Sequence, residues 1–303
     1  MADKHLNPDI NYELYKVFYY VATSLSFSEA SKKLYISQSA VSQSIKLLEK
    51  KLDRKLFIRT TKKVTLTPAG ELLLSHIEPA INLIRRGEDT LSDEASMNYG
   101  QLRIGASDTI CRYYLVPYLK QFHQKYPDVP IRITNATSYA CVDLLEHGEV
   151  DLIIVNYPNS RVDPVYIRKT IDHFQDVFVG NPNAFRLPEK PMTLRQINKY
   201  PIMTLDMKST TTEYLRKLYL KHQLELVPEI RLTSNDLLID LAKIGLGLTF
   251  VPDFCVRQQS PDLRVIETTD KIPSRRIVAA SDPNLPTNAS VDAFLELLPS
   301  VEA

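Results

Sequence analysis

One stretch of sequence decides the fold of the first part of the chain: residues 27–49 read FSEASKKLYISQSAVSQSIKLLE. Apolar residues recur in it at helical spacing on both sides of a short break at residues 35–37. The spacing predicts one helix before the break, capped by Ser26 or Ser28, and a second helix over residues 38–52. Their apolar positions are Phe27, Ala30, Leu34, Val41, Ile45, Leu48 and Leu52. Two short helices joined by about three residues are typical of a helix-turn-helix.

The flanking segments complete a small domain. Residues 11–24 have the apolar spacing of an amphipathic helix. Residues 55–67 hold two β-prone runs around a basic centre, which predicts a hairpin, or wing. Thr67 and Pro68 then form a helix start, and the helix that follows is expected to reach about Glu94. So long a helix with an apolar stripe needs a partner surface, either a second copy of itself or the core of the larger domain.

Charge is divided unevenly along the chain. Residues 1–68 hold 12 Lys and Arg against 6 Asp and Glu, whereas residues 69–303 hold 25 against 30. A small basic head on a larger acidic body indicates that the head binds a polyanion. The 303 residues are about two domains' worth of chain. With 44 % hydrophobic and 24 % charged residues, the composition is ordinary for a soluble globular protein.

The face of the second helix that the apolar residues leave free has the chemistry of a helix in a DNA major groove. Glutamine can contact adenine through two hydrogen bonds, and serine can bond to a base or a phosphate. We predict that bases are contacted mainly by Gln38, Ser39, Ser42 and Gln43. Phosphate contacts are predicted for Lys46, Arg59, Lys62 and Lys63. Any one of these residues taken alone is better explained as solvated surface, so the prediction rests on the whole set.

From residue 99 onward strands alternate with helices, which predicts an α/β layer fold with parallel strands. The predicted strands are 102–106, 131–133, 150–155, 165–169, 176–179, 201–205, 229–232, 248–251, 263–267 and 276–280, and the predicted helices are 113–125, 139–147, 212–222, 235–243 and 290–298. Two lobes joined by crossing strands leave a cleft between them. Ligands in such sheets bind outside the carboxyl ends of the strands.

Residues 27–49 resemble the helix-turn-helix of LysR-type transcriptional regulators, and the resemblance extends over nearly the whole chain. The run Leu56-Phe57-Ile58-Arg59 is similar to that family's wing, and residues 65–70 to the start of its linker helix. Segments similar to its effector domain are 100–105, 115–117, 122–127, 148–152 and 244–252. Tyr35 departs from the pattern because many helix-turn-helix proteins have glycine in this turn, so a less tight turn is expected.

This resemblance implies an α/β fold class with an all-α, winged N-terminal head. The implied domains are a winged helix-turn-helix over 1–67, a long linker and dimerisation helix over 68–96, and a two-lobed, periplasmic-binding-protein-like α/β effector domain over 97–303, with lobe I at 97–168 plus 270–303 and lobe II at 169–269. The resemblance also implies a dimer or tetramer that binds double-stranded DNA at an imperfect inverted repeat near promoters. RNA polymerase is an implied partner, and a small effector is expected in the cleft.

Strand ends and helix starts in both lobes are the places to look for that effector, because free N–H groups and hydroxyls there suit a carboxylate or a phosphate. The predicted effector-binding residues are Ser107, Asp108, Thr109, Thr137, Ser138, Ser209, Thr210, Asn235 and Phe250. Helix capping alone explains each hydroxyl equally well. Asp108 would repel a carboxylate, so either the effector is zwitterionic or Asp108 faces elsewhere. No cofactor is predicted, and the identity of the effector stays open.

Other function classes find no support in the sequence. Common nucleotide-binding, hydrolase and metalloprotease motifs are missing, and six scattered histidines give no metal-ligand spacing, so no enzyme is predicted. A sequence-blind architectural DNA protein would not need a two-lobed body. Three widely spaced cysteines, Cys111, Cys141 and Cys255, indicate a reducing cytoplasm, and a redox role for Cys111 is not favoured. Neither a membrane-spanning apolar run nor a signal peptide is expected.

Overall fold

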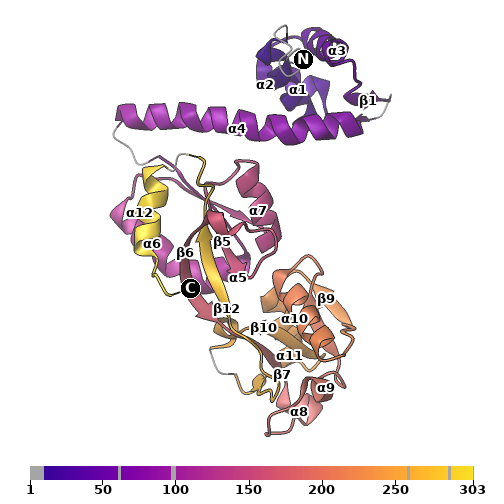
Figure 1. Cartoon of the computed structure of the whole chain (residues 1–303), viewed down its shortest axis with the longest axis vertical. Helices are drawn as coiled ribbons and strands as arrows, with labels where there is room; N and C mark the ends of the chain where they lie inside the picture. Colours follow the sequence, from indigo (N-terminus) through magenta and orange to yellow (C-terminus); the bar gives the residue numbers. More distant parts are fainter. Residues whose placement is uncertain (1–9, 61–62, 97–99, 258–259, 286–287, 303) are drawn as a thin grey trace, which may run out of the picture. The chain divides into compact units, whose positions relative to one another are not determined.

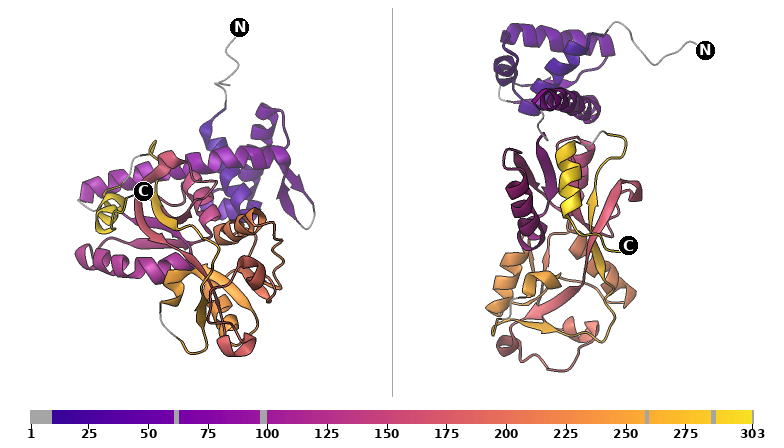
Figure 2. Two further views of the ribbon diagram at one scale, coloured as in Figure 1. Left: turned by 60° about the horizontal axis from the view of Figure 1, so that its bottom comes forward. Right: turned by 90° about the vertical axis from the view of Figure 1, so that its left-hand side faces the viewer.

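The computed structural model describes residues 10–60, 63–96, 100–257, 260–285 and 288–302. The chain divides into two units, residues 1–91 and residues 92–303. Figures 1 and 2 show a helical first unit and a second unit built on two sheets. None of the helices within the described residues is long and apolar enough to cross a membrane.

Helices and a short hairpin make up the first unit, in the order that the sequence predicts. The elements are α1 (Tyr12–Ser24), α2 (Phe27–Leu34), α3 (Gln38–Leu52), β1 (Phe57–Arg59), β2 (Val64–Leu66) and α4 (Pro68–Ser96). β1 and β2 pair antiparallel, so the predicted wing is confirmed. Side-chain oxygens of Asn11, Ser26, Ser37 and Thr67 each accept a hydrogen bond from a backbone N–H in the first turn of the helix that follows.

The core of this unit lies where α1, α2 and α3 meet. The fully buried apolar residues of the three helices are Phe18, Val21, Ala30, Val41, Ile45 and Leu48. Phe57 of the wing closes the core, with its ring centroid 5.5 Å from that of Phe18 and 5.8 Å from that of Phe27. Leu73 and Ile77 of α4 pack against the same cluster. The first turns of α4 are therefore part of the head.

The turn between α2 and α3 is tight although it contains no glycine. Tyr35 ends α2 in the left-handed conformation, with φ 54°. Its N–H donates to the carbonyl of Lys32, and the N–H of Ile36 donates to the carbonyl of Ser31, which closes the helix end. The expectation of a less tight turn is therefore wrong. Tyr35 adopts the conformation that glycine favours, at a cost of about 1–2 kcal/mol.

Two five-stranded sheets form the second unit, and we call them the sheets of lobe I and lobe II. Lobe I has the order β4-β3-β5-β12-β6, and lobe II has the order β11-β7-β10-β8-β9. The strands are β3 (Leu102–Ala106), β4 (Ile131–Asn135), β5 (Leu152–Tyr157), β6 (Ile167–Phe174), β7 (Asp176–Gly180), β8 (Ile202–Leu205), β9 (Ile230–Leu232), β10 (Leu248–Pro252), β11 (Arg264–Ile266) and β12 (Arg275–Ala280). The predicted parallel core is confirmed, because β3 pairs parallel with β4 and β5, and β8 pairs parallel with β9 and β10.

The helices of the second unit follow the strands in the predicted βαβ order. They are α5 (Asp108–Ile110), α6 (Val116–Lys125), α7 (Ser138–Glu146), α8 (Pro182–Phe185), α9 (Leu194–Ile197), α10 (Thr210–Lys221), α11 (Asn235–Lys243) and α12 (Ala289–Leu297), with 3-10 turns at Pro164–Tyr166 and Asp253–Val256. A π-helical turn over Cys111–Leu115 joins α5 to α6. The first helix of lobe I therefore begins at Asp108, five residues before the start predicted from its apolar spacing, because the π turn interrupts that spacing.

The boundary between the lobes lies one strand later than the predicted residue 168. β6 belongs to lobe I, where it pairs with β12 from Ile167 to Phe174. The chain crosses to lobe II at Gln175 and returns before Arg275. Because β6 and β12 are about a hundred residues apart in the sequence, their pairing could not be recognised from local patterns.

Candidate nucleic-acid interface and ligand cavity

The exposed face of α3 holds every side chain that was predicted to contact bases. Gln38, Ser39 and Gln43 are exposed and Ser42 is half-buried. Lys46 is exposed one turn further along the same face. The opposite face of α3 is fixed in the core of the head. The structure thus brings the five side chains to one surface, and their contact with DNA stays a prediction.

The wing holds the other predicted cations and lies beside α2. The guanidinium of Arg59 lies over the ring of Phe27, 3.8 Å from the ring centroid, which orients the arginine. Lys63 is exposed, and its N–H donates to Thr60 Oγ1 at 3.0 Å in the turn of the wing. Lys62, the remaining predicted phosphate contact, lies outside the described residues.

A buried carboxylate that sequence reasoning missed holds the wing against α3. Glu49 is 7 % exposed and accepts hydrogen bonds from Lys55 Nζ at 2.9 Å, from the N–H of Leu56 at 2.9 Å and from the N–H of Phe57 at 3.4 Å. Burial alone would raise the pKa of the Glu49 carboxyl, but these hydrogen bonds outweigh it and hold the pKa below its ordinary value. Because the pKa is lowered on folding, this stabilisation is complete above the unfolded-state pKa and is lost as the pH falls through the folded-state pKa.

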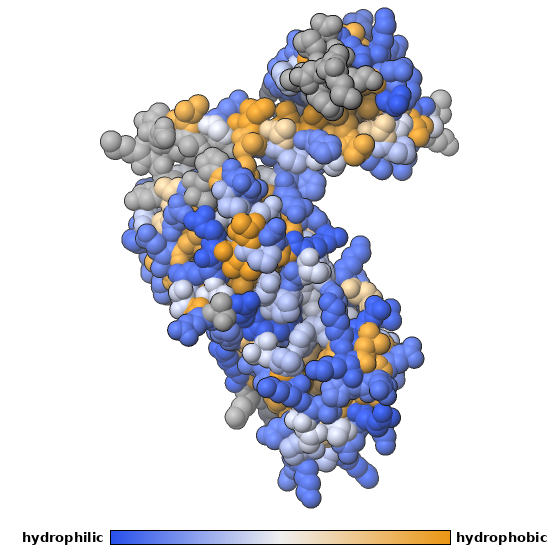
Figure 3. Space-filling view, viewed as in Figure 1, coloured by the Kyte–Doolittle hydropathy of each residue, from blue (hydrophilic) through white to orange (hydrophobic). Residues whose placement is uncertain are grey.

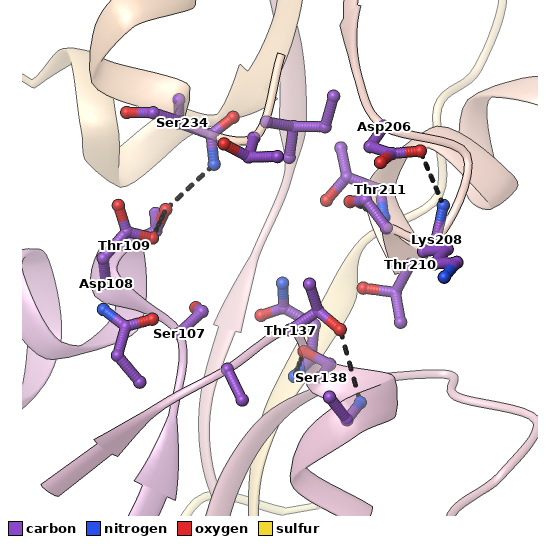
Figure 4. Close-up of a pocket in the computed structure, with 18 residues that line it drawn as sticks. Ser107, Asp108, Thr109, Thr137, Ser138, Asp206, Lys208, Thr210, Thr211 and Ser234 are labelled. Atoms are coloured by element: carbon purple, nitrogen blue, oxygen red, sulfur yellow. Dashed lines mark hydrogen bonds between the residues drawn. The ribbon is translucent and has the colours of Figure 1, made fainter. Parts of the chain in front are cut away.

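A cavity of about 500 Å³ opens between lobe I and lobe II. Its walls are strand ends and helix starts, and Figure 4 shows side chains from both lobes facing a common space. The predicted effector-binding residues that line it are Ser107, Asp108, Thr109, Thr137, Ser138, Ser209, Thr210 and Asn235. Asp108 therefore faces the cavity rather than elsewhere. That these residues contact a ligand stays a prediction.

Four helices begin at the cavity, and the hydroxyl residues that cap them line it. Ser107, Thr137, Ser209 and Ser234 each accept a backbone N–H of α5, α7, α10 and α11, respectively. The capping explanation therefore holds for three of the predicted hydroxyl residues, Ser107, Thr137 and Ser209, and it also applies to Ser234, which was not predicted. A hydroxyl that accepts a hydrogen bond keeps its own proton to donate, so capping and ligand contact are compatible.

Phe250 does not belong to the cavity, which corrects its predicted place. Its side chain is 2 % exposed and packs inside lobe II, with ring centroids 4.7 Å from Phe178 and 6.4 Å from Tyr214. Every residue of β10 is buried, because the strand lies in the middle of the sheet. Sequence reasoning missed other lining residues, which lie at or just after the ends of β4, β5, β8 and β9 or in the first turn of α10. Their place near a strand end or a helix start is the signal that could have found them. They are Asn135, Asn156, Asp206, Lys208, Thr211, Thr233 and Ser234.

Side-chain hydrogen bonds join the two lobes at one wall of the cavity. Asn235 Nδ2 of lobe II donates to Thr109 Oγ1 of lobe I at 3.0 Å. Next to it, Asp236 accepts from Arg112 Nη1 at 3.2 Å and from the hydroxyl of Tyr113. Burial, together with the Asp236 carboxylate, raises the pKa of Tyr113, so its phenol stays protonated and remains a donor. α11 is thus tied to the start of the first helix of lobe I.

Two family models match most of the chain. Residues 12–71 match the bacterial regulatory helix-turn-helix protein of the lysR family, and residues 96–302 match the LysR substrate binding domain. The chain belongs to the LysR family. It is therefore a transcription regulator and not an enzyme.

Known proteins similar to this LysR-family chain cover most of its length. It is 27 % identical over 289 residues to a probable RuBisCO transcriptional regulator of Trichormus variabilis, covering 92 % of this chain and 85 % of the relative. It is 28 % identical over 253 residues to the HTH-type transcriptional regulator CysB of Haemophilus influenzae, covering 82 % and 77 %. The crystal structure of full-length CbnR complexed with its target DNA matches with a TM-score of 0.68 and 17 % identity, covering 95 % of this chain and 99 % of that one. The last match shows that the fold is shared.

The thiols of this LysR-family protein are free and poorly reactive. Burial raises the pKa of Cys111 to about 11 and that of Cys141 to about 12, and it also raises the pKa of Cys255. Because the thiolate is the reactive form, these pKa values do not favour redox chemistry at neutral pH. Within the described residues, no group of three or more His, Cys, Asp or Glu side chains is placed to hold a metal ion.

Proposed function

We propose that this LysR-family protein reads double-stranded DNA with α3 and the wing, and that a small molecule bound in the interlobe cavity controls its binding. The observation that carries the proposal is the surface of α3, where Gln38, Ser39, Gln43 and Lys46 are exposed while the opposite face is locked in the core. The likeness to CbnR, a protein solved with its target DNA, supports the same use of the head.

Replacing Gln38 by alanine should weaken binding to the cognate operator by about 5- to 150-fold, because a two-bond contact to a base is worth about 1–3 kcal/mol of discrimination. Binding to a scrambled duplex of the same length should not change. Replacing Lys63 by alanine should weaken binding to both duplexes alike and lower the slope of log affinity against log salt by about one. Fluorescence anisotropy over a range of salt concentrations measures both effects. The reverse pattern would contradict the proposed division between base and phosphate contacts.

Among the described residues of the head, Tyr35 is the most exposed large hydrophobic residue. Its side chain is 95 % exposed, beside the start of α3, although its backbone takes a conformation that disfavours tyrosine. We propose that its phenol contacts the DNA backbone. Replacing Tyr35 by glycine should therefore raise the free energy of unfolding by about 1 kcal/mol and at the same time lower affinity for all DNA severalfold.

Asp53 offers the matched control for Tyr35, because it ends α3 with φ 50° in the same left-handed conformation. Replacing Asp53 by glycine should raise stability without weakening DNA binding. Thermal unfolding and anisotropy titration of both variants provide the comparison. If the Tyr35→Gly variant binds DNA as tightly as the parent protein, Tyr35 has no part in the interface.

The exposed side of α4 supports self-association. Figure 3 shows hydrophobic side chains along this helix. Those exposed to solvent are Leu72, Leu83, Ile84 and Leu91. We propose that α4 packs against a second copy, so that a dimer or tetramer reads an imperfect inverted repeat with half-sites about 34 Å apart, or a multiple of that distance. RNA polymerase as a partner and a cytoplasmic location, where bacterial DNA lies, belong to this proposal.

The proposed control acts through the angle between the lobes. A ligand can shift this angle only if it binds one arrangement of the lobes more tightly than another. The shift would change the packing of subunits and the spacing of the DNA-reading heads. Footprinting of the purified protein on DNA upstream of its own gene and of the divergent neighbour would locate the operator. If the footprint, the DNA bend and the quaternary shape stay the same with a verified effector, this mechanism fails.

A further inference from the structure

The interlobe cavity has a lining that restricts the chemistry of its ligand. Of the residues that line it in the described part of the chain, only Ala136, Ala140 and Leu205 are apolar, and none is aromatic or an arginine. Ligand cavities of this size are usually lined mostly by apolar and aromatic groups. The side chains that line it therefore offer a ligand mainly hydrogen bonds and charge, and no aromatic surface.

One side of the cavity offers a carboxylate and a hydrogen-bond acceptor that has no donor among the described residues. Figure 4 shows Asp108, Thr109 and Ser234 on this side. Asn235 Nδ2 donates to Thr109 Oγ1 at 3.0 Å, and that hydroxyl lies 3.5 Å from Asp108 Oδ1. The hydrogen-bond chain leaves the Oδ1 atom of Asn235 without a partner among the described residues, although the side chain is only 5 % exposed. A buried acceptor without a donor is costly, so this side favours a ligand that donates hydrogen bonds.

Asn156 repeats this arrangement at the end of β5. It lines the same cavity, is 9 % exposed, and its Oδ1 atom also has no donor among the described residues. The Asp108 carboxylate and the Asn235 amide oxygen suit an ammonium group, which has three N–H donors and a positive charge. Asn156 lies beside Ser138 at the start of α7, where its N–H donates to Ser138 Oγ at 3.3 Å, so its amide oxygen is a separate acceptor for the ligand.

The other side of the cavity offers donors and positive charge. Figure 4 places Lys208, Thr210 and Thr137 there, at the starts of α10 and α7. These helices have twelve and nine residues, and the first N–H groups of each have no acceptor within the helix. Helix N-termini and a lysine stabilise an anion such as a carboxylate. Asp206 also lines this side, so a ligand that had only negative charge would face Asp108 and Asp206 against one lysine.

We propose that the cavity binds a small zwitterion with both an ammonium and a carboxylate group, the class to which free α-amino acids belong. The ammonium lies at Asp108 and Asn235, and the carboxylate lies at Lys208 and the starts of α7 and α10. The inference rests on the proposed function only in taking this cavity as the effector site. Of the two alternatives that the sequence leaves open, it takes the zwitterionic effector, because Asp108 lines the cavity and would stabilise a positive group.

Calorimetric titration of the full chain with a panel of common L-α-amino acids tests the proposal. At least one amino acid should bind. The matched carboxylic acid without the amino group and the matched amine without the carboxylate should each bind at least tenfold more weakly. If no amino acid in the panel binds, or if the deaminated acid binds as tightly as its parent, the proposal is overturned.

Two charge variants test which residue contacts the ammonium group of the ligand and which contacts its carboxylate. Replacing Asp108 by asparagine should lower affinity for the amino acid at least tenfold and leave affinity for the deaminated acid unchanged or higher. Replacing Lys208 by glutamine should lower the affinity for the amino acid and for the deaminated acid by the same factor. It should leave the affinity for the matched amine unchanged. Asp128 is exposed and does not line the cavity, so Asp128→Asn is the control and should change none of these affinities. Equal effects of the two charge variants on all three ligands would overturn the assignment.

The outcome is independent of the test of the proposed function. Operator binding by the same preparations is measured without any amino acid. A protein that prefers its operator but binds no zwitterion overturns the ligand class alone. A protein that binds every duplex equally overturns the proposed function, whatever it binds in the cavity.

Discussion

Replacing Gly70 by alanine should lower the free energy of unfolding of the head by about 2–3 kcal/mol. It should also disrupt the packing of α4 against the wing. A Cβ atom on Gly70 would lie 2.2 Å from the carbonyl oxygen of Leu56 and 2.9 Å from Leu66 Cδ2. The first of these atoms belongs to the backbone just before β1, so it cannot move aside without displacing the wing. Hydrogen exchange of the amides in the head and thermal unfolding of the full chain measure the loss.

Gly87 provides a control in the same helix, with an expected effect of opposite sign. Apart from its chain neighbours and the backbone of its own helix, no atom of the described residues lies within 4 Å of the Cβ atom that an alanine would add at Gly87, and its backbone is helical. Because glycine in a helix interior costs about 0.5–1 kcal/mol relative to alanine, Gly87→Ala should stabilise α4. If the two variants change stability in the same direction, the close approach of α4 to the wing is not what requires glycine at position 70.

Replacing Asp176 by asparagine should lower the free energy of unfolding of the second unit by about 3–5 kcal/mol, because it leaves a buried positive charge without its partner. Arg275 Nη1 donates to Asp176 Oδ2 at 2.9 Å and to Thr211 Oγ1 at 3.1 Å, and both charged side chains are fully buried. Asp176 begins β7 and Arg275 begins β12, so the pair lies where the chain passes between the lobes. Denaturant unfolding followed by circular dichroism measures the change.

Removing both charges should cost much less than removing one. The double variant Asp176→Leu with Arg275→Met replaces the pair by apolar groups, and such replacements are often neutral or stabilising. The exposed Asp128→Asn variant should change stability by less than about 0.5 kcal/mol. If Asp176→Asn is as mild as that control, water or another group must compensate the arginine charge.

The head could be predicted from sequence because its signals are local. Helix caps, such as Ser26 and Thr67, and apolar stripes both act within one or two helical turns. As a result, α3 begins and ends at the residues that the spacing of its apolar positions predicted. Glu49 could not be predicted to be buried, because its partners Lys55, Leu56 and Phe57 reach it only once the wing has folded back. A charged residue at a helical surface position gives no sign of such partners.

The location of the candidate cavity could be predicted from the sequence, but only some of the residues that line it could be. Strand ends and helix starts led to eight of its lining residues, because in parallel sheets these positions meet at one edge. Phe250 was misplaced because position along a strand does not tell whether a side chain faces a cleft or the core, and β10 is covered on both faces. Asn156 and Lys208 lie near the ends of β5 and β8, but they were missed because a place near a strand end does not show which side chains there face the opposite lobe.

The position of β12 has a consequence for biosynthesis. This strand follows the whole of lobe II in the sequence, yet it lies between β5 and β6 in the lobe I sheet. All strands and helices of the head, and then all those of lobe II, are translated before β12. Until β12 is translated, β5 and β6 lack the strand that pairs with both of them. We therefore expect lobe I to finish folding after lobe II, although most of lobe I is translated first.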